Sequence, residues 1–322
     1  MQKQQTNQEL ATPVAARYAR TSASVQSQRR NQWLALMLLS PALILFIMFG
    51  IGPMLGAAYL SVLKWNGLGS PVFVGLSNWI AYFHDTEALK SLWLTIEVMI
   101  FSWLIQTPIS MMVGLYLAGR QRHRSWIGTG YFLPLLLSSV AIGLLWSYIL
   151  NPNFGLVDTL MTNLHLKFLA LDWLGSPRLA LWSLVAIVSW QYIPFHSLLY
   201  QAGRRQVSES LYEAACLDGA NGWQEFWFIT LPQLKYTVVT STVLMLTGSL
   251  TYFDLIYILT NGGPGDATNV LALNMYETAF NKQLMGYGSV MAVVIAVFGI
   301  LLSVVMIRLT GFKNMESQAE GV

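Results

Sequence analysis

The run from Asn31 to Leu63 carries no charged residue, and it restricts what this chain can fold into more than any other feature. A bilayer core of roughly 30 Å is crossed by about 20 apolar residues in a helix, so the run is long enough for one membrane span. Pro41 and Gly52-Pro53 lie inside it. They predict a kinked or broken helix, which membrane proteins tolerate.

Five further apolar runs pass the same test and predict an all-α integral membrane protein with six transmembrane helices. These runs cover residues 92–118, 126–150, 179–201, 237–260 and 290–309. Charged residues make up only 10% of the 322 residues, whereas a soluble domain usually has about 25%. So few charges cannot solvate a globule of this size, which excludes a soluble enzyme and an intrinsically disordered chain.

The distribution of lysine and arginine predicts the orientation of the helices. With the N-terminus placed inside, 13 of the 18 basic residues fall in segments that face the cytoplasm. Basic residues concentrate in the cytoplasmic loops of membrane proteins, so both termini are predicted to lie inside. Three regions follow: a polar cytoplasmic tail over 1–32, a transmembrane domain over 33–312 and a cytoplasmic C-terminal tail over 313–322.

The cytoplasmic segment between the fourth and fifth predicted spans contains signals for two short helices. Ser208 or Ser210 can cap the first helix, and Ser210 with Glu213 three residues later matches the capping-box pattern. This helix is expected to run to Asp218. Gly219 then supplies a residue that turns easily with a positive φ.

The second short helix is expected between Trp223 and Phe228, with aromatic side chains on its surface. Two interpretations of this pair of helices follow from the residues alone. They could form an amphipathic connector in the membrane interface, where such helices bury Trp and Phe. They could equally form a docking surface for a soluble partner, because Ala214, Ala215 and Gly219 permit close approach.

The order of residues in this segment resembles a known motif. Glu213-Ala214-Ala215, then Gly219, then Ile229-Thr230-Leu231-Pro232 is similar to the EAA loop of binding-protein-dependent ABC transporter permeases. Residues 73–79 and 259–265 are similar to segments of the carbohydrate-uptake branch, which includes the maltose and glycerol-3-phosphate permeases. The resemblance covers nearly everything except the N-terminal tail.

The resemblance implies the transmembrane subunit of an ATP-driven importer, which moves a sugar or related polyol compound by alternating access. The EAA loop, here residues 204–236, would couple transport to separate cytoplasmic ATPase subunits. Glu213 would face a basic residue of the ATPase, and Gly219 would permit the turn. The resemblance assigns this coupling to Glu213, Ala214, Ala215, Asp218, Gly219, Ile229, Leu231 and Pro232.

The resemblance also implies a set of partners. The carbohydrate branch pairs two different permease chains with two copies of the ATPase and an extracytoplasmic solute-binding protein. The outer segments Asn151–Arg178 and Asn261–Lys282 would meet that binding protein. The expected location is the cytoplasmic (inner) membrane of a bacterium or archaeon, with several passes through the lipid bilayer. No nucleic acid is expected as a partner.

The sequence contains no phosphate-binding pattern G-x-x-x-x-G-K-[ST], because the dipeptide Gly-Lys occurs nowhere in the chain. We therefore expect a transporter subunit that is not an enzyme, with no ATPase site, catalytic residue or cofactor of its own. ATP and Mg would be held by the partner ATPase. The four histidines lack metal-ligand spacing, so no metal site is expected.

Polar and aromatic residues in the fourth and fifth predicted spans are candidates for the substrate pathway. They are Trp190, Gln191, Tyr192, Tyr252 and Asp254. A sugar needs hydrogen-bonding groups for its hydroxyls and flat apolar surfaces for its rings, and these side chains supply both. The alternative role for each is helix packing or an aromatic belt at the membrane surface.

Two other functions stay open from the residues alone. A secondary carrier or channel that works without ATP needs only a membrane bundle, but it leaves the EAA loop unexplained. A protonophore would stop a proton-coupled carrier while ATP is maintained, which separates the two mechanisms. A membrane-embedded enzyme would need a catalytic constellation, and neither G-x-S-x-G nor H-E-x-x-H occurs.

Overall fold

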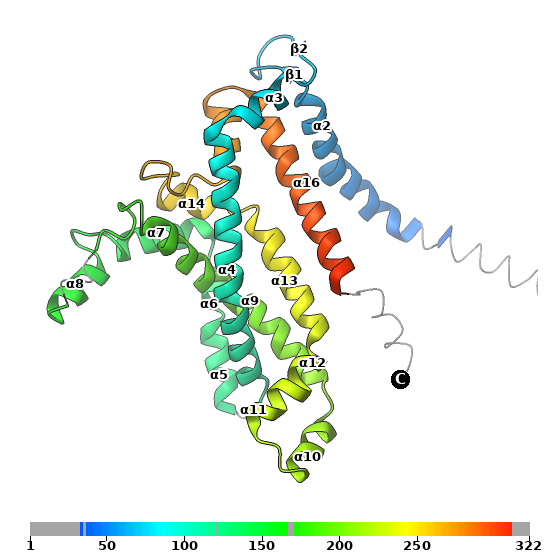
Figure 1. The fold of residues 1–322 in the computed structure, drawn as a ribbon, viewed down its shortest axis with the longest axis vertical. Helices are drawn as coiled ribbons and strands as arrows, with labels where there is room; N and C mark the ends of the chain where they lie inside the picture. Colours follow the sequence, from blue (N-terminus) through cyan, green and yellow to red (C-terminus); the bar gives the residue numbers. More distant parts are fainter. Residues whose placement is uncertain (1–32, 35–36, 120–121, 167–170, 311–322) are drawn as a thin grey trace, which may run out of the picture. The chain divides into compact units, whose positions relative to one another are not determined.

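The computed structural model of the chain describes residues 33–34, 37–119, 122–166 and 171–310. Both predicted tails lie outside the described residues. The described part is helical apart from two short strands, so the all-α prediction is confirmed (Figure 1). The chain divides at Gly56–Ala57 into two compact units.

The first unit contains most of a long apolar helix that continues past the unit boundary. The helix runs over Met37–Leu60 and includes a π-helical turn, η1 (Ile47–Ile51), followed by α2 (Gly52–Leu60). The sequence predicts a kink or break at Gly52-Pro53, and the π-helical turn lies directly before this pair. Pro53 has no N–H to donate to the preceding turn, so a local departure from α-helical bonding is expected there.

The second unit begins with a hairpin and a short helix. Strands β1 (Leu63–Lys64) and β2 (Val72–Phe73) pair antiparallel, with Leu63 opposite Phe73. The side chain of Asn78, in α3 (Ser77–His84), donates a hydrogen bond to the Leu63 carbonyl oxygen at 2.9 Å. This bond ties the hairpin to α3.

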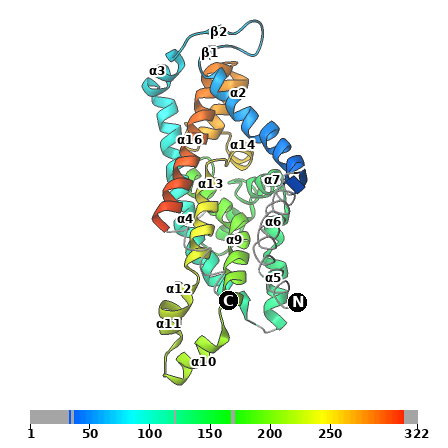
Figure 2. The same cartoon turned by 90° about the vertical axis from the view of Figure 1, so that its right-hand side faces the viewer.

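Two long helices packed side by side form the centre of the second unit, α4 (Thr86–Ala118) and α9 (Ala180–Gln206) (Figures 1 and 2). Their backbones come close at Gly114, where a Cβ would lie 2.5 Å from the Ser197 carbonyl oxygen. Small residues permit such close approach between membrane helices. The C-terminal parts of α4 and α9 therefore pack backbone to backbone around Gly114 and Ser197.

Two more helices complete the bundle: α13 (Lys235–Ser249), which packs on α4, and α16 (Met285–Thr310), which packs on α13. Between them the chain passes through three short helical elements. These are α14 (Asp254–Leu259), α15 (Leu271–Tyr276) and a π-helical turn, η4 (Glu277–Asn281).

The predicted outer segment before α16 is more buried than an outer loop would be. Most of residues 270–279 are buried, although the sequence predicts an outer loop over Asn261–Lys282. The Asn274 side-chain amide donates to Ser91 Oγ at 2.8 Å, and the Leu271 N–H donates to Thr95 Oγ1 at 2.9 Å. Hydroxyls on one face of α4 thus hold this segment by hydrogen bonds that hydropathy does not register.

Two predicted spans are interrupted. Residues 126–150 contain the end of α5 (Arg122–Tyr131), then α6 (Leu133–Leu136) and α7 (Ser139–Ile149). The break before α7 arises because Ser138 is extended and its hydroxyl caps α7, accepting a hydrogen bond from the Ala141 N–H at 3.2 Å. A second break, at residues 250–253, separates α13 from α14.

Three helices among the described residues are long and apolar enough to cross a membrane: Met37–Leu60, Thr86–Ala118 and Met285–Arg308. Every one of the six predicted runs contains helix, and α8 (Leu156–Asn163) lies between the third and fourth. The structure is thus that of an integral membrane protein with several long apolar helices. The count of six spans and their orientation stay predictions.

Candidate functional site

A cavity of about 300 Å³ opens where α9, α13, the start of α14 and the break before α7 meet. Four of the five residues predicted for the substrate pathway line it: Gln191, Tyr192, Tyr252 and Asp254. Gln191 and Tyr192 belong to α9, whereas Tyr252 lies in the break before α14 and Asp254 begins α14, so the EAA loop separates the two pairs in the sequence. The fold therefore brings this predicted group together in one place.

Two tyrosine rings form one wall of the cavity. The rings of Tyr192 and Tyr252 stack with their centres 5.5 Å apart and their planes at 24°. The Gln191 amide nitrogen donates to Ser139 Oγ at 3.5 Å. Its Oε1 is buried and accepts no hydrogen bond within the described part of the chain, which leaves an acceptor for another donor.

The local backbone explains which side chains face the cavity. Val188, Gln191, Tyr192 and Phe195 recur at helical spacing, so α9 presents them on a single face. The break at residues 250–253 lets consecutive side chains of that segment line the cavity, which a continuous helix would spread around its circumference.

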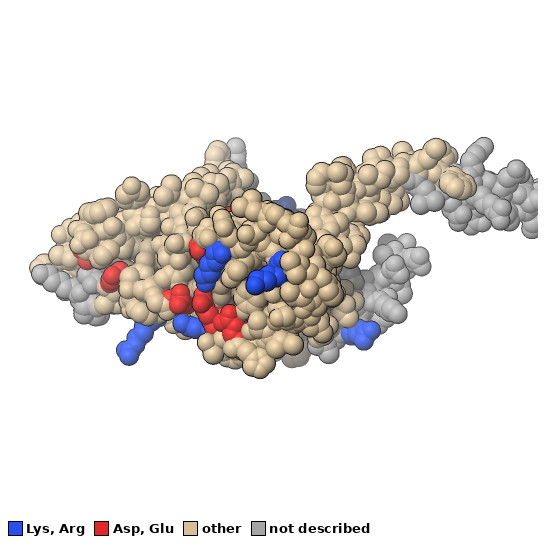
Figure 3. Space-filling view, turned by 90° about the horizontal axis from the view of Figure 1, so that it is seen from above, with Lys and Arg blue, Asp and Glu red and all other residues tan. Residues whose placement is uncertain are grey.

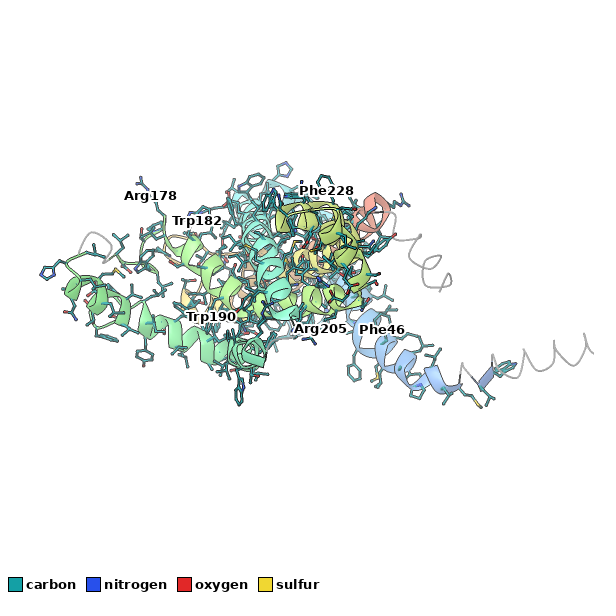
Figure 4. All side chains as sticks on the ribbon, turned by 90° about the horizontal axis from the view of Figure 1, so that it is seen from below. Phe46, Arg178, Trp182, Trp190, Arg205 and Phe228 are labelled. Carbon is teal, nitrogen blue, oxygen red and sulfur yellow. The ribbon has the colours of Figure 1, made fainter. Side chains whose placement is uncertain are left out.

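Trp190, the fifth predicted pathway residue, lies outside this cavity. One residue turns a helix by about 100°, so the neighbour of Gln191 points away from the cavity-lining face. Its ring packs edge-on against Trp146 with the ring centres 5.5 Å apart, and 37% of the residue is exposed. Figure 4 labels Trp190 on α9.

Three polar lining residues were not among the predicted pathway residues: Ser139, His196 and Thr251. Ser139 and Thr251 stand at the two helix breaks, and continuous apolar runs give no sign of those breaks. His196 is 4% exposed, and its Nδ1 lies 3.0 Å from Ser241 Oγ. The cavity offers aromatic faces, an amide, hydroxyls and a carboxylate, a combination suited to a neutral polyhydroxylated molecule.

The second candidate region is the predicted EAA loop, which lies at the end of the second unit away from α3 (Figures 1 and 2). Its elements are α10 (Glu209–Leu217), α11 (Gly222–Glu225), a π-helical turn, η3 (Phe226–Thr230), and α12 (Leu231–Gln233). The two short helices predicted from the sequence are thus present, and the chain continues from α12 into α13.

The predicted capping box of α10 is wrong. The helix begins one residue after Ser208, so Ser210 lies inside its first turn, and the Ser208 side chain makes no capping bond. The two hydroxyls instead lie 2.7 Å apart. A capping box forms at α11, where the Asn221 side chain accepts from the Gln224 N–H and the Gln224 side chain accepts from the Asn221 N–H.

The turn after α10 is confirmed at Gly219, which has φ +78 and nothing within 4 Å of an added Cβ. The eight residues assigned to coupling divide by exposure. The exposed ones are Glu213, Ala214, Asp218, Gly219 and Pro232, whereas Ala215 is buried and Ile229 and Leu231 are half-buried.

An aromatic cluster accompanies the turn. Trp223 lies against Phe226 and Trp227, with ring centres 6.0 and 5.8 Å apart. Phe228 stays 78% exposed and is labelled in Figure 4, which views this end of the molecule. The loop therefore offers a carboxylate, small residues and exposed aromatic rings on the same end of the bundle.

The opposite end of the second unit carries charges of both signs (Figure 3). Lys282 Nζ lies 3.4 Å from Glu87 Oε1, and the Tyr287 hydroxyl donates to Asp85 Oδ2 at 2.7 Å. Burial acts to raise the pKa of Asp85, but the bond from Tyr287, two backbone N–H bonds and the charge of Lys282 outweigh it and lower the pKa.

Comparison with known proteins gives concordant matches. A family model described as "Binding-protein-dependent transport system inner membrane component" matches residues 106–312. The probable ABC transporter permease protein YurN of Bacillus subtilis is 33% identical over 282 residues, 87% of this chain and 96% of that protein. The trehalose/maltose transport system permease protein MalF of Thermococcus litoralis is 30% identical over 282 residues, 87% of this chain and 94% of that protein.

A solved structure shares the fold. It is the crystal structure of a bacterial alginate ABC transporter in complex with an alginate pentasaccharide-bound periplasmic protein. One of its chains matches with a TM-score of 0.77 and 21% identity, over 88% of this chain and 96% of that chain.

Proposed function

We propose a function for this chain from one premise: it belongs to the family of binding-protein-dependent transport system inner membrane components. It is the membrane permease of a binding-protein-dependent ABC importer, and it is the permease component rather than the ATPase. We propose that its cargo is a sugar or a related polyol compound, moved by alternating access about the cavity.

One observation carries the proposed cargo: two stacked tyrosine rings, the amide of Gln191 and the carboxylate of Asp254 line a single cavity of about 300 Å³. Apolar faces of a sugar ring can lie against Tyr192 and Tyr252, while its hydroxyls exchange hydrogen bonds with the polar groups. The relative named for trehalose and maltose transport supports the same class of cargo.

The energy for transport enters, in this proposal, through the EAA loop. Glu213, Ala214, Asp218 and Gly219 are exposed and would contact a separate cytoplasmic ATPase, present in two copies, that holds ATP and Mg. The less exposed Ala215, Ile229 and Leu231 would preserve the shape of the loop, with Pro232 leading into α13. Closure of the two ATPases would rock the helices about the cavity.

The chain would cross the membrane six times and would assemble with further partners. Six spans within 33–312 and cytoplasmic tails over 1–32 and 313–322 agree with the lysine and arginine distribution. A second homologous permease chain would face this one across the pathway. A solute-binding protein would dock outside, on exposed parts of the outer segments. The membrane would be the inner membrane of a bacterium or archaeon.

Co-purification tests the assembly. We expect the chain, tagged and extracted from native membranes in mild detergent, to carry with it one second permease and two copies of an ATPase. Purification alone, without ATP hydrolysis in the sample, would contradict the proposal and favour a carrier that works without ATP.

Transport by variants tests the cavity. In vesicles that contain the complete complex and its binding protein, we expect Tyr192→Ala with Tyr252→Ala to abolish uptake of labelled substrate while the complex still assembles. Trp190→Phe, which changes a neighbouring ring outside the cavity, serves as the matched control and should retain uptake. Equal uptake by both variants would contradict the assigned pathway.

A further inference from the structure

Tyr212 stands directly before the EAA sequence, and both ends of its side chain contact other elements. The guanidinium carbon of Arg204 lies 3.8 Å from the centre of its ring. Its hydroxyl lies 3.0 Å from Thr230 Oγ1. Arg204 belongs to the last turn of α9 and Thr230 ends η3, so one side chain of α10 reaches both flanks of the loop.

The contact with α9 is made by charge and by the face of the ring. A guanidinium over an aromatic ring is attracted to its negative face. Arg204 Nη2 also lies 3.8 Å from Glu209 Oε2, so the same cation approaches α10 at two points. The Arg204 side chain is only 21% exposed, which limits the water that competes for it. This contact requires the ring of Tyr212 but not its hydroxyl.

The contact on the other flank requires the hydroxyl. Thr230 is 6% exposed, and its carbonyl oxygen accepts a hydrogen bond from the Leu234 N–H at 2.9 Å. Leu234 in turn is 1% exposed at the start of α13. Thr230 is thus fixed to the N-terminal end of α13, here called its base. The Tyr212–Thr230 hydrogen bond joins α10 to that base.

The C-terminal end of α9, which we call its base, lies close to the base of α13. A Cβ on Gly203 would lie 2.6 Å from Thr237 Oγ1 and 2.8 Å from Leu234 Cδ2. The same two helices continue to the cavity, where α9 contributes Gln191 and Tyr192 and α13 contributes Gly248. The contacts of Tyr212 therefore link α10 to the same two helices that line the cavity.

We propose that Tyr212 is a positioning residue that holds α10 on α9 and α13 together, so that a displacement of α10 by the ATPase moves both helices. We call the Tyr212–Thr230 hydrogen bond, which connects α10 to the base of α13, the strut. This inference rests on the proposed function. The exposed docking residues Glu213 and Gly219 make no part of the strut, so removing the strut separates docking from transmission.

The experiment uses the complete complex in detergent and reads cavity opening directly. Cys216, the chain's single cysteine, is replaced by serine, and Thr251→Cys places a thiol in the cavity lining. Maleimide labelling is compared without nucleotide and with ATP plus vanadate. We expect labelling in this reporter background to change with nucleotide.

The strut is removed in that background by Tyr212→Phe or by Thr230→Val, each of which deletes one hydroxyl and keeps the shape. We expect the nucleotide-dependent change in labelling to fall about three- to tenfold, the factor typical of one lost hydrogen bond. ATPase co-purification should stay unchanged. Thr230→Ser keeps the hydroxyl and should restore the change, and the double variant should be no worse than either single variant.

Tyr236→Phe is the matched control, since no hydrogen bond of the Tyr236 hydroxyl is found among the described residues. An undiminished change in labelling with Tyr212→Phe and Thr230→Val would overturn the strut. A reporter that does not respond to nucleotide even with the strut intact would instead overturn the ATP-driven rocking of the proposed function, and the strut with it.

Discussion

At the scale of the residue, Gly219 carries two separate requirements. Its φ of +78 lies in the left-handed region, where a residue with a Cβ is strained by about 1–2 kcal/mol. The space around it is open, because nothing lies within 4 Å of an added Cβ. A substitution there is therefore resisted by the turn itself and, in the proposed function, by the ATPase that would dock on the turn, but not by packing within this chain.

Gly219→Asp should abolish uptake while the protein inserts into the membrane at normal levels. Asp tolerates a positive φ better than most residues, so the fold should persist, but its charge and size would obstruct the proposed docking face. The measurement is uptake in vesicles at matched expression. Gly222→Asp adds the same charge at the first turn of α11, where an acidic residue is favourable, and should retain uptake. Full uptake by Gly219→Asp would refute docking at this turn.

Asp85 shows how one carboxylate fixes the start of a long helix. It accepts hydrogen bonds from the N–H groups of Glu87 and Ala88, which explains why α4 begins at Thr86 rather than at the predicted Leu92. It also accepts from Tyr287 in α16. These hydrogen bonds therefore stabilise the ionised form of Asp85.

The lowered pKa of Asp85 predicts acid sensitivity. The stabilisation that ionised Asp85 contributes is fully present above the unfolded-state carboxyl pKa of about 4. It is lost as the pH falls through the lower folded-state pKa. Thermal unfolding of the purified protein should show a decline below pH 4 that is smaller in Asp85→Asn, since Asn still caps a helix but does not titrate. The same decline in both proteins would contradict this assignment.

At the scale of the element, the close packing of α4 on α9 depends on Gly114. An added Cβ would lie 2.5 Å from the Ser197 carbonyl oxygen and 2.7 Å from Tyr200 Cβ, and neither is a flexible end that can move aside. Figure 1 shows these helices running alongside each other through the second unit. Any side chain at this position must separate them.

Gly114→Ala should lower the free energy of unfolding by about 1–3 kcal/mol, the usual cost of overpacking. Thermal unfolding in detergent measures it. Gly130→Ala, in α5, meets nothing within 4 Å and serves as the control, with an unchanged or slightly higher midpoint. An unchanged midpoint for Gly114→Ala would show that the helices separate there without cost.

At the scale of the whole molecule, the predicted orientation rests on the distribution of lysine and arginine. Cys216 is the chain's only cysteine and is exposed on α10, so it is a ready-made label for the predicted cytoplasmic face. A membrane-impermeant maleimide should leave Cys216 unlabelled in intact cells. The same reagent should label Cys216 in inverted vesicles. Asn153→Cys with Cys216→Ser moves the thiol to the predicted outer segment and should reverse the result. Labelling of both thiols from one side would refute the six-span topology.

The sequence by itself determined the class of protein, the presence of helix in each of the six apolar runs, and the two short helices of the predicted EAA loop with the turn at Gly219. Length of apolar segments and the φ demanded by a turn are local properties, so they can be obtained from consecutive residues. Motifs are local as well, and the loop and the outer segments carried the resemblance without any knowledge of packing.

Only the tertiary structure decided which polar residues share the cavity. Tyr192 stacks on Tyr252, whereas Trp190 packs on Trp146 outside the cavity, and each of these ring contacts joins segments that are far apart in the chain. The burial of residues 270–279 rests likewise on Ser91 and Thr95 of α4. Hydropathy sums over neighbours in sequence, whereas these hydrogen bonds and ring contacts join neighbours in space.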